Sequence, residues 1–300
     1  MFRFFVLISL YCCAVMAQDK QREKEIEHGS RIAKAGFRNE DDVCRKFNAW
    51  KTDEDARGWL KAMNYRLGDI KSVKAAKLHG HKSDVEILVR TAQGESTQGI
   101  SIKLVSSPNG FNQIDKRWLK AYAKMWTMPR NVVSAMKLYL GETPPTGKTK
   151  RSDRTYLTEL PAESRDAVIG FFRKHKSKII SDLLAGDGEH AAEWFMVTLK
   201  SKKGLPRWTI RPMKDTIRFY SEGEVVMTRY GNLKLGRISM QRKGGDNGRP
   251  TANMLQFKLN PAQLFSARTE KASQPRKPDR KQPPSRLPAL PDVENRQTAK

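Results

Sequence analysis

The chain has little of what several classes of protein require. Two of its three cysteines, Cys12 and Cys13, lie in the first apolar run, so a chain without that run forms no internal disulfide. Its five histidines form no cluster at zinc-ligand spacing, which argues against a zinc centre. It has no glycine-rich cofactor loop after a predicted strand and no Pro-Cys pair, which argues against a methyltransferase. Solenoid repeats are also absent.

Acidic residues are scarce relative to basic ones. The chain has 57 Lys and Arg against 32 Asp and Glu, a formal charge of +25. A field of that sign attracts polyanions, so nucleic acid or an acidic membrane surface is the natural partner. With 300 residues, six Trp and twelve Phe, the chain is long enough to bury one large core or two modest ones.

The N-terminal segment has the pattern of a secretory signal. A basic Arg3 precedes an apolar run at 4–17 that ends in small residues. The alternative is that translation starts near Met16, and the run is too short for a comfortable membrane span. We favour a cytoplasmic protein that starts near Met16, with export as the alternative. Residues 1–28 are then an extension ahead of a folded domain at 29–266.

The stretch from His81 to Trp118 carries the strongest pattern. One alternating strand begins at Asp84, and after a glycine-containing turn a second alternating strand includes Ser101 and Lys103. Because side chains alternate across a strand, pairing the two strands places these three polar side chains on one face, at one edge of a sheet.

Such a set of side chains suits phosphodiester hydrolysis. The reaction needs a hard oxygen ligand for Mg²⁺, further oxygen ligands beside it, and a cation near the attacking water and the phosphate. The spacing alone is also typical of an ordinary surface hairpin. Glu40, on a helix predicted over 29–50, can reach such a metal cluster; alternatively it only compensates the helix dipole in an acidic first turn.

A tight loop at 106–113 follows the hairpin. It raises the large ring of Phe111 among small and polar residues, where the ring can act as a wedge between DNA bases. Asn112 and Gln113 can offer amide groups to unstacked bases, and Lys116 extends this candidate DNA-binding surface. The alternative is that Phe111 folds back onto a helix predicted from Gln113 to Trp126.

The middle of the chain is predicted to be mostly helical. A loop at 148–154 is basic and suits contact with backbone phosphates. Periodicity indicates helices at 54–63, 132–140, 162–174 and 177–184, and a strand at 194–199.

A second hairpin lies near the C-terminus. Strands are predicted at 237–242 and 253–259, joined by a glycine-rich loop whose backbone can approach a DNA groove. Its polar side chains suit the edges of bases. The candidates are Gln241, Arg242, Lys243, Asp246, Asn247, Arg249 and Asn253. Residues 267–300 contain six prolines, nine basic and four acidic residues, and are predicted to be a disordered tail.

Four blocks of the chain resemble one family. They are RIAKAGFRNEDDV, SDVEILV with GISIKLVSSPNGFNQIDKRWL, HAAEWFMV, and RISMQRKGGDNGRPTANMLQFKLNP. Together they resemble the HinP-type type II restriction endonucleases that recognise GCGC, in the PD-(D/E)xK nuclease superfamily. The resemblance covers roughly 29–265. It implies an α/β, restriction-endonuclease-like core with a central mixed β-sheet flanked by helices, and Mg²⁺-dependent cleavage of double-stranded DNA after the first G of GCGC.

The resemblance also implies roles for individual residues. Asp84 takes the place of the metal-binding aspartate, Lys103 that of the motif lysine, and the carbonyl near Ile102 that of a metal ligand. Phe111 and Gln113 match the loop that enters DNA, and 241–249 lies in the block associated with base recognition. A cognate methyltransferase is the implied functional partner, and both DNA strands are cut either by a homodimer or by successive nicks.

Ser101 departs from the family pattern, which has Gln at that position. A serine hydroxyl binds Mg²⁺ weakly and without charge. We therefore expect lower metal affinity, substitution by Gln98 or Glu86, or impaired cleavage. The alternative function is a DNA-binding protein of the same fold that no longer cuts.

Overall fold

We analysed a computed structural model of the chain. It describes residues 27, 30–201, 204–245 and 249–266. The chain divides into two units, 1–267 and 268–300, and the second lies outside the described residues. The N-terminal apolar run, Asp246, Asn247 and the basic tail also lie outside them. Within the described ranges, no helix is both long and apolar enough to cross a bilayer.

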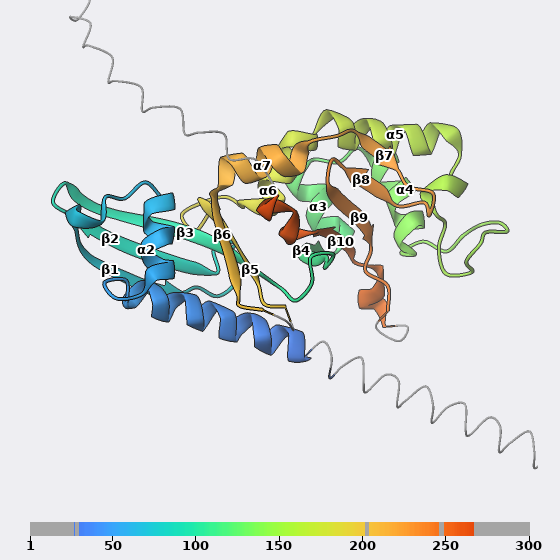
Figure 1. Ribbon diagram of the computed structural model, residues 1–300. Coiled ribbons are helices and arrows are strands. Elements are labelled where there is room, and N and C mark those ends of the chain that lie inside the picture. Colours follow the sequence, from blue (N-terminus) through green and yellow to red (C-terminus); the bar gives the residue numbers. More distant parts are fainter. Residues whose placement is uncertain (1–26, 28–29, 202–203, 246–248, 267–300) are drawn as a thin grey trace, which may run out of the picture. The chain divides into compact units, whose positions relative to one another are not determined.

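The first sheet is mixed and has the strand order β1-β2-β3-β5-β6. The β3 and β5 strands are parallel, and the other neighbours are antiparallel. One face is covered by a helix at 30–48 and by α2 (Glu54–Ala62), whose aromatic side chains pack on the apolar side chains of β2 and β3 (Figure 1). The strands are β1 (Ile70–Lys77), β2 (Val85–Thr91), β3 (Gly94–Val105), β5 (Trp194–Leu199) and β6 (Arg207–Pro212).

The second sheet is antiparallel, in the order β4-β10-β9-β8-β7. Its strands are β4 (Asn112–Arg117), β7 (Val225–Met227), β8 (Leu233–Leu235), β9 (Ile238–Arg242) and β10 (Leu255–Leu259). The helices around it are α3 (Leu119–Met125), α4 (Arg130–Leu140), α5 (Ala162–Lys174), α6 (Lys176–Leu184) and α7 (Met213–Ser221). Short 3₁₀ helices lie at Leu67–Asp69, Leu157–Glu159, Pro250–Asn253 and Pro261–Phe265.

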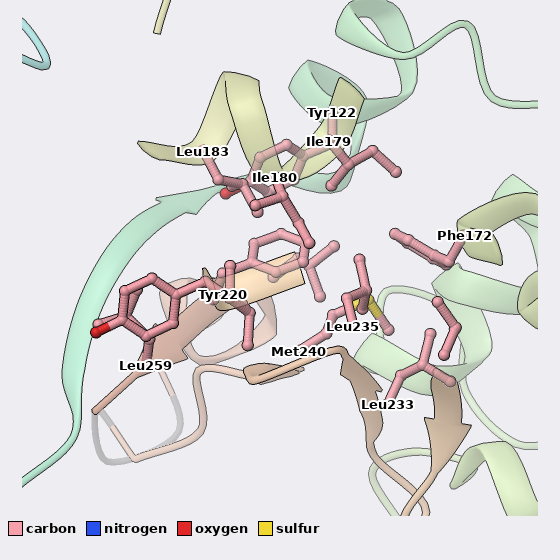
Figure 2. Close-up of a cluster of buried hydrophobic side chains, with 14 of the residues drawn as sticks. Tyr122, Phe172, Ile179, Ile180, Leu183, Tyr220, Leu233, Leu235, Met240 and Leu259 are labelled. Atoms are coloured by element: carbon pink, nitrogen blue, oxygen red, sulfur yellow. The ribbon is translucent and has the colours of Figure 1, made fainter. Parts of the chain in front are cut away.

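The larger core lies between this second sheet and its helices. Figure 2 shows Ile179, Ile180 and Leu183 of α6 packed with Tyr122, Phe172 and Tyr220, against Leu233, Leu235, Met240 and Leu259 of the sheet. Burial of this many apolar side chains fixes β4 and β9 in place. The outer faces of those strands are thereby held at defined positions.

The predicted fold class is confirmed: the structure is α/β, with a mixed central sheet flanked by helices. The helices predicted at 54–63, 132–140, 162–174 and 177–184 are present, as is the strand at 194–199. The helix predicted from Gln113 to Trp126 is wrong, because its first part pairs as strand β4 with β10 and only Leu119–Met125 is helical. The sequence interpretation also missed β6, β7, β8 and α7.

Candidate active site

Asp84 lies immediately before β2, with its carboxylate turned toward β3. Its backbone amide donates to the carbonyl of Ile100 at 2.9 Å, which fixes the residue against the neighbouring strand. Its Oδ2 accepts hydrogen bonds from the amide of Ile102 at 2.6 Å and from the hydroxyl of Ser101 at 3.4 Å. These contacts all go to Oδ2, so Oδ1 is the oxygen that is available to a metal ion.

Lys103 completes the predicted set. Its Nζ lies 3.3 Å from Oδ2 of Asp84 and donates to the carbonyl of Ile102 at 2.9 Å. Both charged side chains are largely covered, with 18% of the lysine and 25% of the aspartate side chain exposed. The alternation of β2 and β3 therefore brings Asp84, Ser101 and Lys103 together on one face, as the sequence pattern predicts.

Glu40, on the helix at 30–48, lies within electrostatic range of Asp84 and Lys103. Burial and the negative charge of Asp84 raise the pKa of Glu40 to about 7, against the opposing effect of Lys77 and Lys103. Burial is the largest of these effects, and the charge of Asp84 adds to it. A cation bound near both carboxylates would favour the ionised form of Glu40. Glu40 lies in the middle of the helix at 30–48 and not in its first turn, so the helix dipole does not account for it.

The donor set fits a hard divalent cation. Mg²⁺ prefers oxygen ligands, keeps several of its waters and commonly binds one or two carboxylates. Asp84 and Glu40 provide the carboxylates, Ser101 a hydroxyl and Ile102 a carbonyl. Across the described ranges there is no group of three or more His, Cys, Asp or Glu that could hold a metal ion.

The two expected substitutes for Ser101 differ in position. Gln98 accepts a hydrogen bond from the indole of Trp194 at 2.7 Å, on the opposite face of β3 from Ser101. That prediction is therefore wrong. Glu86 follows Asp84 on the same face of β2, but its carboxylate lies 3.5 Å from Nδ1 of His190.

A cleft of about 610 Å³ opens beside this candidate catalytic group. The first sheet contributes Asp84, Ser101 and Lys103, and the second contributes Asp115 and Arg117 of β4. The edge that carries Asp84 and Lys103 therefore adjoins the strand that follows the Phe111 loop.

The second sheet gathers predicted DNA-binding residues on its outer face. The register places Lys116 opposite Gln256, which in turn lies opposite Gln241. Gln113 lies opposite Lys258 in the same way. Because facing residues in a sheet share a side, β4 and the distant hairpin place these polar side chains on the same face, with Gln256 buried between its neighbours. Lys258 was missed by the sequence interpretation, although it alternates with the apolar residues of β10.

Positive charge is concentrated at the end of this surface. Burial lowers the pKa of Lys243, and the neighbouring charges of Lys116 and Arg249 lower it further. Cations from β4 and from both sides of the glycine-rich loop therefore lie close together. A polyanion would neutralise their mutual repulsion.

The Phe111 ring is 56% exposed, so the alternative in which it folds back is wrong. Asn260 supports the loop by donating to the carbonyl of Pro108 at 2.8 Å. Asn112, by contrast, uses its amide to donate to the carbonyl of Leu104 at 3.0 Å. Phe111 is thus an exposed large apolar side chain on this loop.

Arg242 and Asn253 are engaged with other parts of the protein. Arg242 forms an ion pair with Asp153 at 2.8 Å and donates to Oδ1 of Asn253 at 2.6 Å. Asn253 in turn donates to the carbonyl of Gly141 at 2.9 Å. The two side chains connect the glycine-rich hairpin to the loop at 141–154.

Comparison with known proteins identifies the family. A sequence model of the R.HinP1I restriction endonuclease matches residues 63–265, more than half of the chain. The chain belongs to the R.HinP1I restriction endonuclease family. A member of this family is a type II site-specific deoxyribonuclease, which binds double-stranded DNA and uses divalent metal ions. None of the curated proteins matches the chain.

The fold is also similar to that of a solved restriction endonuclease. The structure of MspI in complex with its cognate DNA aligns with a TM-score of 0.56 at 13% sequence identity. The alignment covers 77% of this chain and 92% of MspI. At this identity the likeness concerns the fold, and it agrees with the mixed sheet and flanking helices described above.

Proposed function

We propose that this R.HinP1I-family enzyme uses Mg²⁺ to hydrolyse double-stranded DNA at the palindrome GCGC, cutting after the first G. The observation that carries the proposal is the assembly of Asp84, Ser101 and Lys103 beside Glu40, on a cleft that adjoins β4. The choice of GCGC rests on the resemblance of the block at 237–261 to the HinP-type enzymes.

Four groups would hold the metal ion: the carboxylates of Asp84 and Glu40, the hydroxyl of Ser101 and the carbonyl of Ile102. A bound Mg²⁺ lowers the pKa of its water and stabilises negative charge on the phosphate in the transition state. The hydrogen bond from the amide of Ile102 keeps Asp84 in place for this role. Ser101 adds a weak, uncharged ligand, so the site depends chiefly on the two carboxylates.

Lys103 orients the attacking water and offsets charge on the scissile phosphate. Its ammonium already donates to Asp84 and to the carbonyl of Ile102, so it is anchored at the catalytic edge. A protonated lysine acts there as a point charge, and this role requires no proton transfer from it.

The outer face of the second sheet would hold the DNA. Gln113, Gln241 and Lys258 lie across it, and Lys116, Lys243 and Arg249 supply positive charge for phosphates or guanine edges. Phe111 would enter the base stack as a wedge. Asp246 and Asn247, at the tip of the hairpin, remain predicted base contacts. For Arg242, Asn253 and Asn112 we propose support of the DNA-contacting loops, given their contacts within the protein.

The proposed setting is the cytoplasm, where the enzyme would act with a cognate methyltransferase that protects host DNA. A palindrome presents the same sequence on both strands. A homodimer would place one catalytic group on each strand, whereas a monomer would nick the strands one after the other.

A plasmid of known sequence tests the proposal. Purified full-length protein is incubated with it in Mg²⁺ and, separately, in EDTA. We expect discrete fragments only in Mg²⁺, with every end mapping after the first G of GCGC. Fragments that end elsewhere would overturn the proposed sequence. A salt-sensitive gel shift without any fragments would instead favour the DNA-binding protein without cleavage. Nicked circles that accumulate before linear plasmid would indicate successive nicking.

A further inference from the structure

Lys82 connects the catalytic strand to the second sheet. It lies two residues before Asp84, but its side chain extends away toward β4 and α6. Its Nζ donates to Oδ2 of Asp115 at 2.6 Å and to the carbonyls of Leu183 at 2.8 Å and Ile114 at 3.2 Å. An ammonium group has three hydrogen-bond donors, so all of them are used.

The stem of Lys82 is closely enclosed as well. Gly186 has φ of +74°, and a Cβ built there would lie 2.5 Å from Cγ of Lys82. Only 19% of the lysine side chain is exposed. The residue therefore has little room to adopt another arrangement.

Asp115, the partner of Lys82, is also fully engaged. Its Oδ1 accepts hydrogen bonds from the hydroxyl of Tyr122 at 2.5 Å and from Nε of Arg117 at 2.9 Å. Burial disfavours the ionised form, but the hydrogen bond from Arg117 and the charge of Lys82 hold the pKa of Asp115 below its usual value. The pair is thus an ionised, hydrogen-bonded unit in a largely buried position.

The position of Asp115 on β4 gives this unit a second connection. Asp115 lies opposite Phe257 and faces inward, whereas Gln113 and Lys116 lie opposite polar residues of β10 on the outer face. The outer face of β4 therefore belongs to the proposed DNA surface, and its inner face carries the carboxylate that binds Lys82. Any displacement of β4 moves the group to which Lys82 is bound.

We propose that the Lys82–Asp115 ion pair transmits the fit of β4 on DNA to the position of Asp84. The inference rests on the proposed function, because it assumes that β4 contacts the DNA that is cut. Lys82 and Asp115 are positioning residues in this account, since neither touches the reacting phosphate. A correct fit on the recognised sequence would hold Asp84 where the metal ion requires it. A changed base pair would shift β4 and thereby misplace the carboxylate.

The test compares two DNA duplexes. One contains GCGC, the proposed recognition sequence, and the other differs from it by one base pair. Binding is measured with Ca²⁺ in place of Mg²⁺, and single-turnover cleavage is then measured in Mg²⁺. The variant is Lys82→Met in the full chain. The control is Lys46→Met, which removes another partly buried, ion-paired lysine, bonded to Asp53 and Asp55 away from the cleft.

We expect Lys82→Met to bind the cognate duplex nearly as tightly as wild type but to cut it roughly 10- to 100-fold more slowly, because a misplacement of about 1 Å has effects of that size. Cleavage of the altered duplex should fall much less, so the ratio of the two rates drops. Lys46→Met should leave that ratio unchanged. A residue that merely stabilises the fold would lower both rates together.

Tyr122→Phe provides a second, milder variant if Lys82→Met does not fold. It removes one hydroxyl from Asp115 and keeps the buried ring, and we expect the same change in the ratio at a smaller amplitude. Equal losses on both duplexes, or no loss on either, would overturn the inference. A wild-type enzyme that cuts neither duplex would overturn the proposed function, and the inference with it.

Discussion

The backbone amide of Ile102 donates a 2.6 Å hydrogen bond to Oδ2 of Asp84. This bond joins the residue just before β2 to the middle of β3, so the carboxylate is held by the sheet itself. Because the donor belongs to the backbone, no substitution at residue 102 other than proline removes it. This shorter bond to Asp84 therefore remains whatever side chain stands at 101, whereas the 3.4 Å bond from the Ser101 hydroxyl does not.

Asp84→Ala is expected to abolish cleavage while most of the DNA binding remains. The change removes the proposed metal ligand, and we expect a rate loss of at least about 1000-fold in Mg²⁺. Affinity should fall only slightly, because binding depends largely on phosphate contacts elsewhere. Plasmid cleavage and a gel shift in Ca²⁺ measure the two effects. If Asp84→Ala cuts at the wild-type rate, Asp84 is not an active-site residue.

Ser101 is predicted to tune metal affinity. Ser101→Ala removes a weak ligand, so we expect cleavage within about tenfold of wild type and a higher Mg²⁺ concentration for the half-maximal rate. Ser101→Asp adds a charged ligand that lines the same cleft, and the Mg²⁺ requirement should fall. Titration of the cleavage rate with Mg²⁺ checks both. If the two variants shift the midpoint in the same direction, Ser101 is not a ligand.

The sequence predicted that Asp84, Ser101 and Lys103 share one face because that signal is local. Side chains alternate along each strand, so pairing β2 with β3 puts all three residues on the same side of the sheet. This holds whatever surrounds the hairpin. Residues 112–117, with the sequence NQIDKR, have little intrinsic tendency to form a strand, and their extended conformation comes from pairing with the distant β10. Local pattern therefore missed β4.

Ion pairs between residues far apart in the chain also produce no sequence pattern from which they could be predicted. Lys82 and Asp115 meet because two sheets adjoin, and no periodicity links their positions. The sequence also left open whether Glu40 binds a metal ion or only compensates the helix dipole. The answer depends on how the helix crosses the sheet, which local sequence does not determine. Strands β7 and β8 have three residues each, too few for alternation to stand out.

Glu40→Gln is expected to stabilise the metal-free protein at neutral pH. The pKa of Glu40 rises from its ordinary value of 4.5 to about 7 on folding, so the folded state favours the protonated form. The stability that this provides is complete below pH 4.5 and is lost as pH rises through about 7. In EDTA the variant should therefore match wild type in acid and exceed it by about 1 kcal/mol at pH 8, after allowance for solvent screening.

Thermal unfolding across this pH range measures the effect, and Glu163→Gln, at an exposed position in the first turn of α5, controls for the loss of one carboxylate. In Mg²⁺ the order should reverse, because wild type gains a ligand that the variant lacks. An Mg²⁺-induced stabilisation of equal size in both proteins would exclude Glu40 from the metal site.

Phe111→Ala is expected to weaken DNA binding without affecting the fold. The ring is 56% exposed, so its loss removes little from the core. Stacking of an aromatic ring on a base contributes about 1–3 kcal/mol, and we expect binding to the cognate duplex to weaken accordingly. Leu205→Ala is the matched control, since Leu205 is an exposed apolar residue, 89% accessible, that has no proposed DNA contact. Equal affinities for Phe111→Ala and wild type would rule out the wedge.

Gly99→Ala tests how closely the backbone must pack behind Asp84. A Cβ at Gly99 would lie 2.2 Å from Oγ of Ser83 and 2.7 Å from the carbonyl of Ala191. Since neither a buried serine nor a backbone carbonyl can yield cheaply, we expect a loss of about 1–3 kcal/mol in the free energy of unfolding. Ser83 immediately precedes Asp84, so the cleavage rate of the folded fraction should fall as well.

Gly170→Ala, in α5 with no atom within 4 Å of its Cβ, should instead be neutral or stabilising. Chemical denaturation gives the stabilities, and single-turnover cleavage below the unfolding transition gives the rates; an unchanged rate in Gly99→Ala would show that Asp84 tolerates displacement of its neighbour.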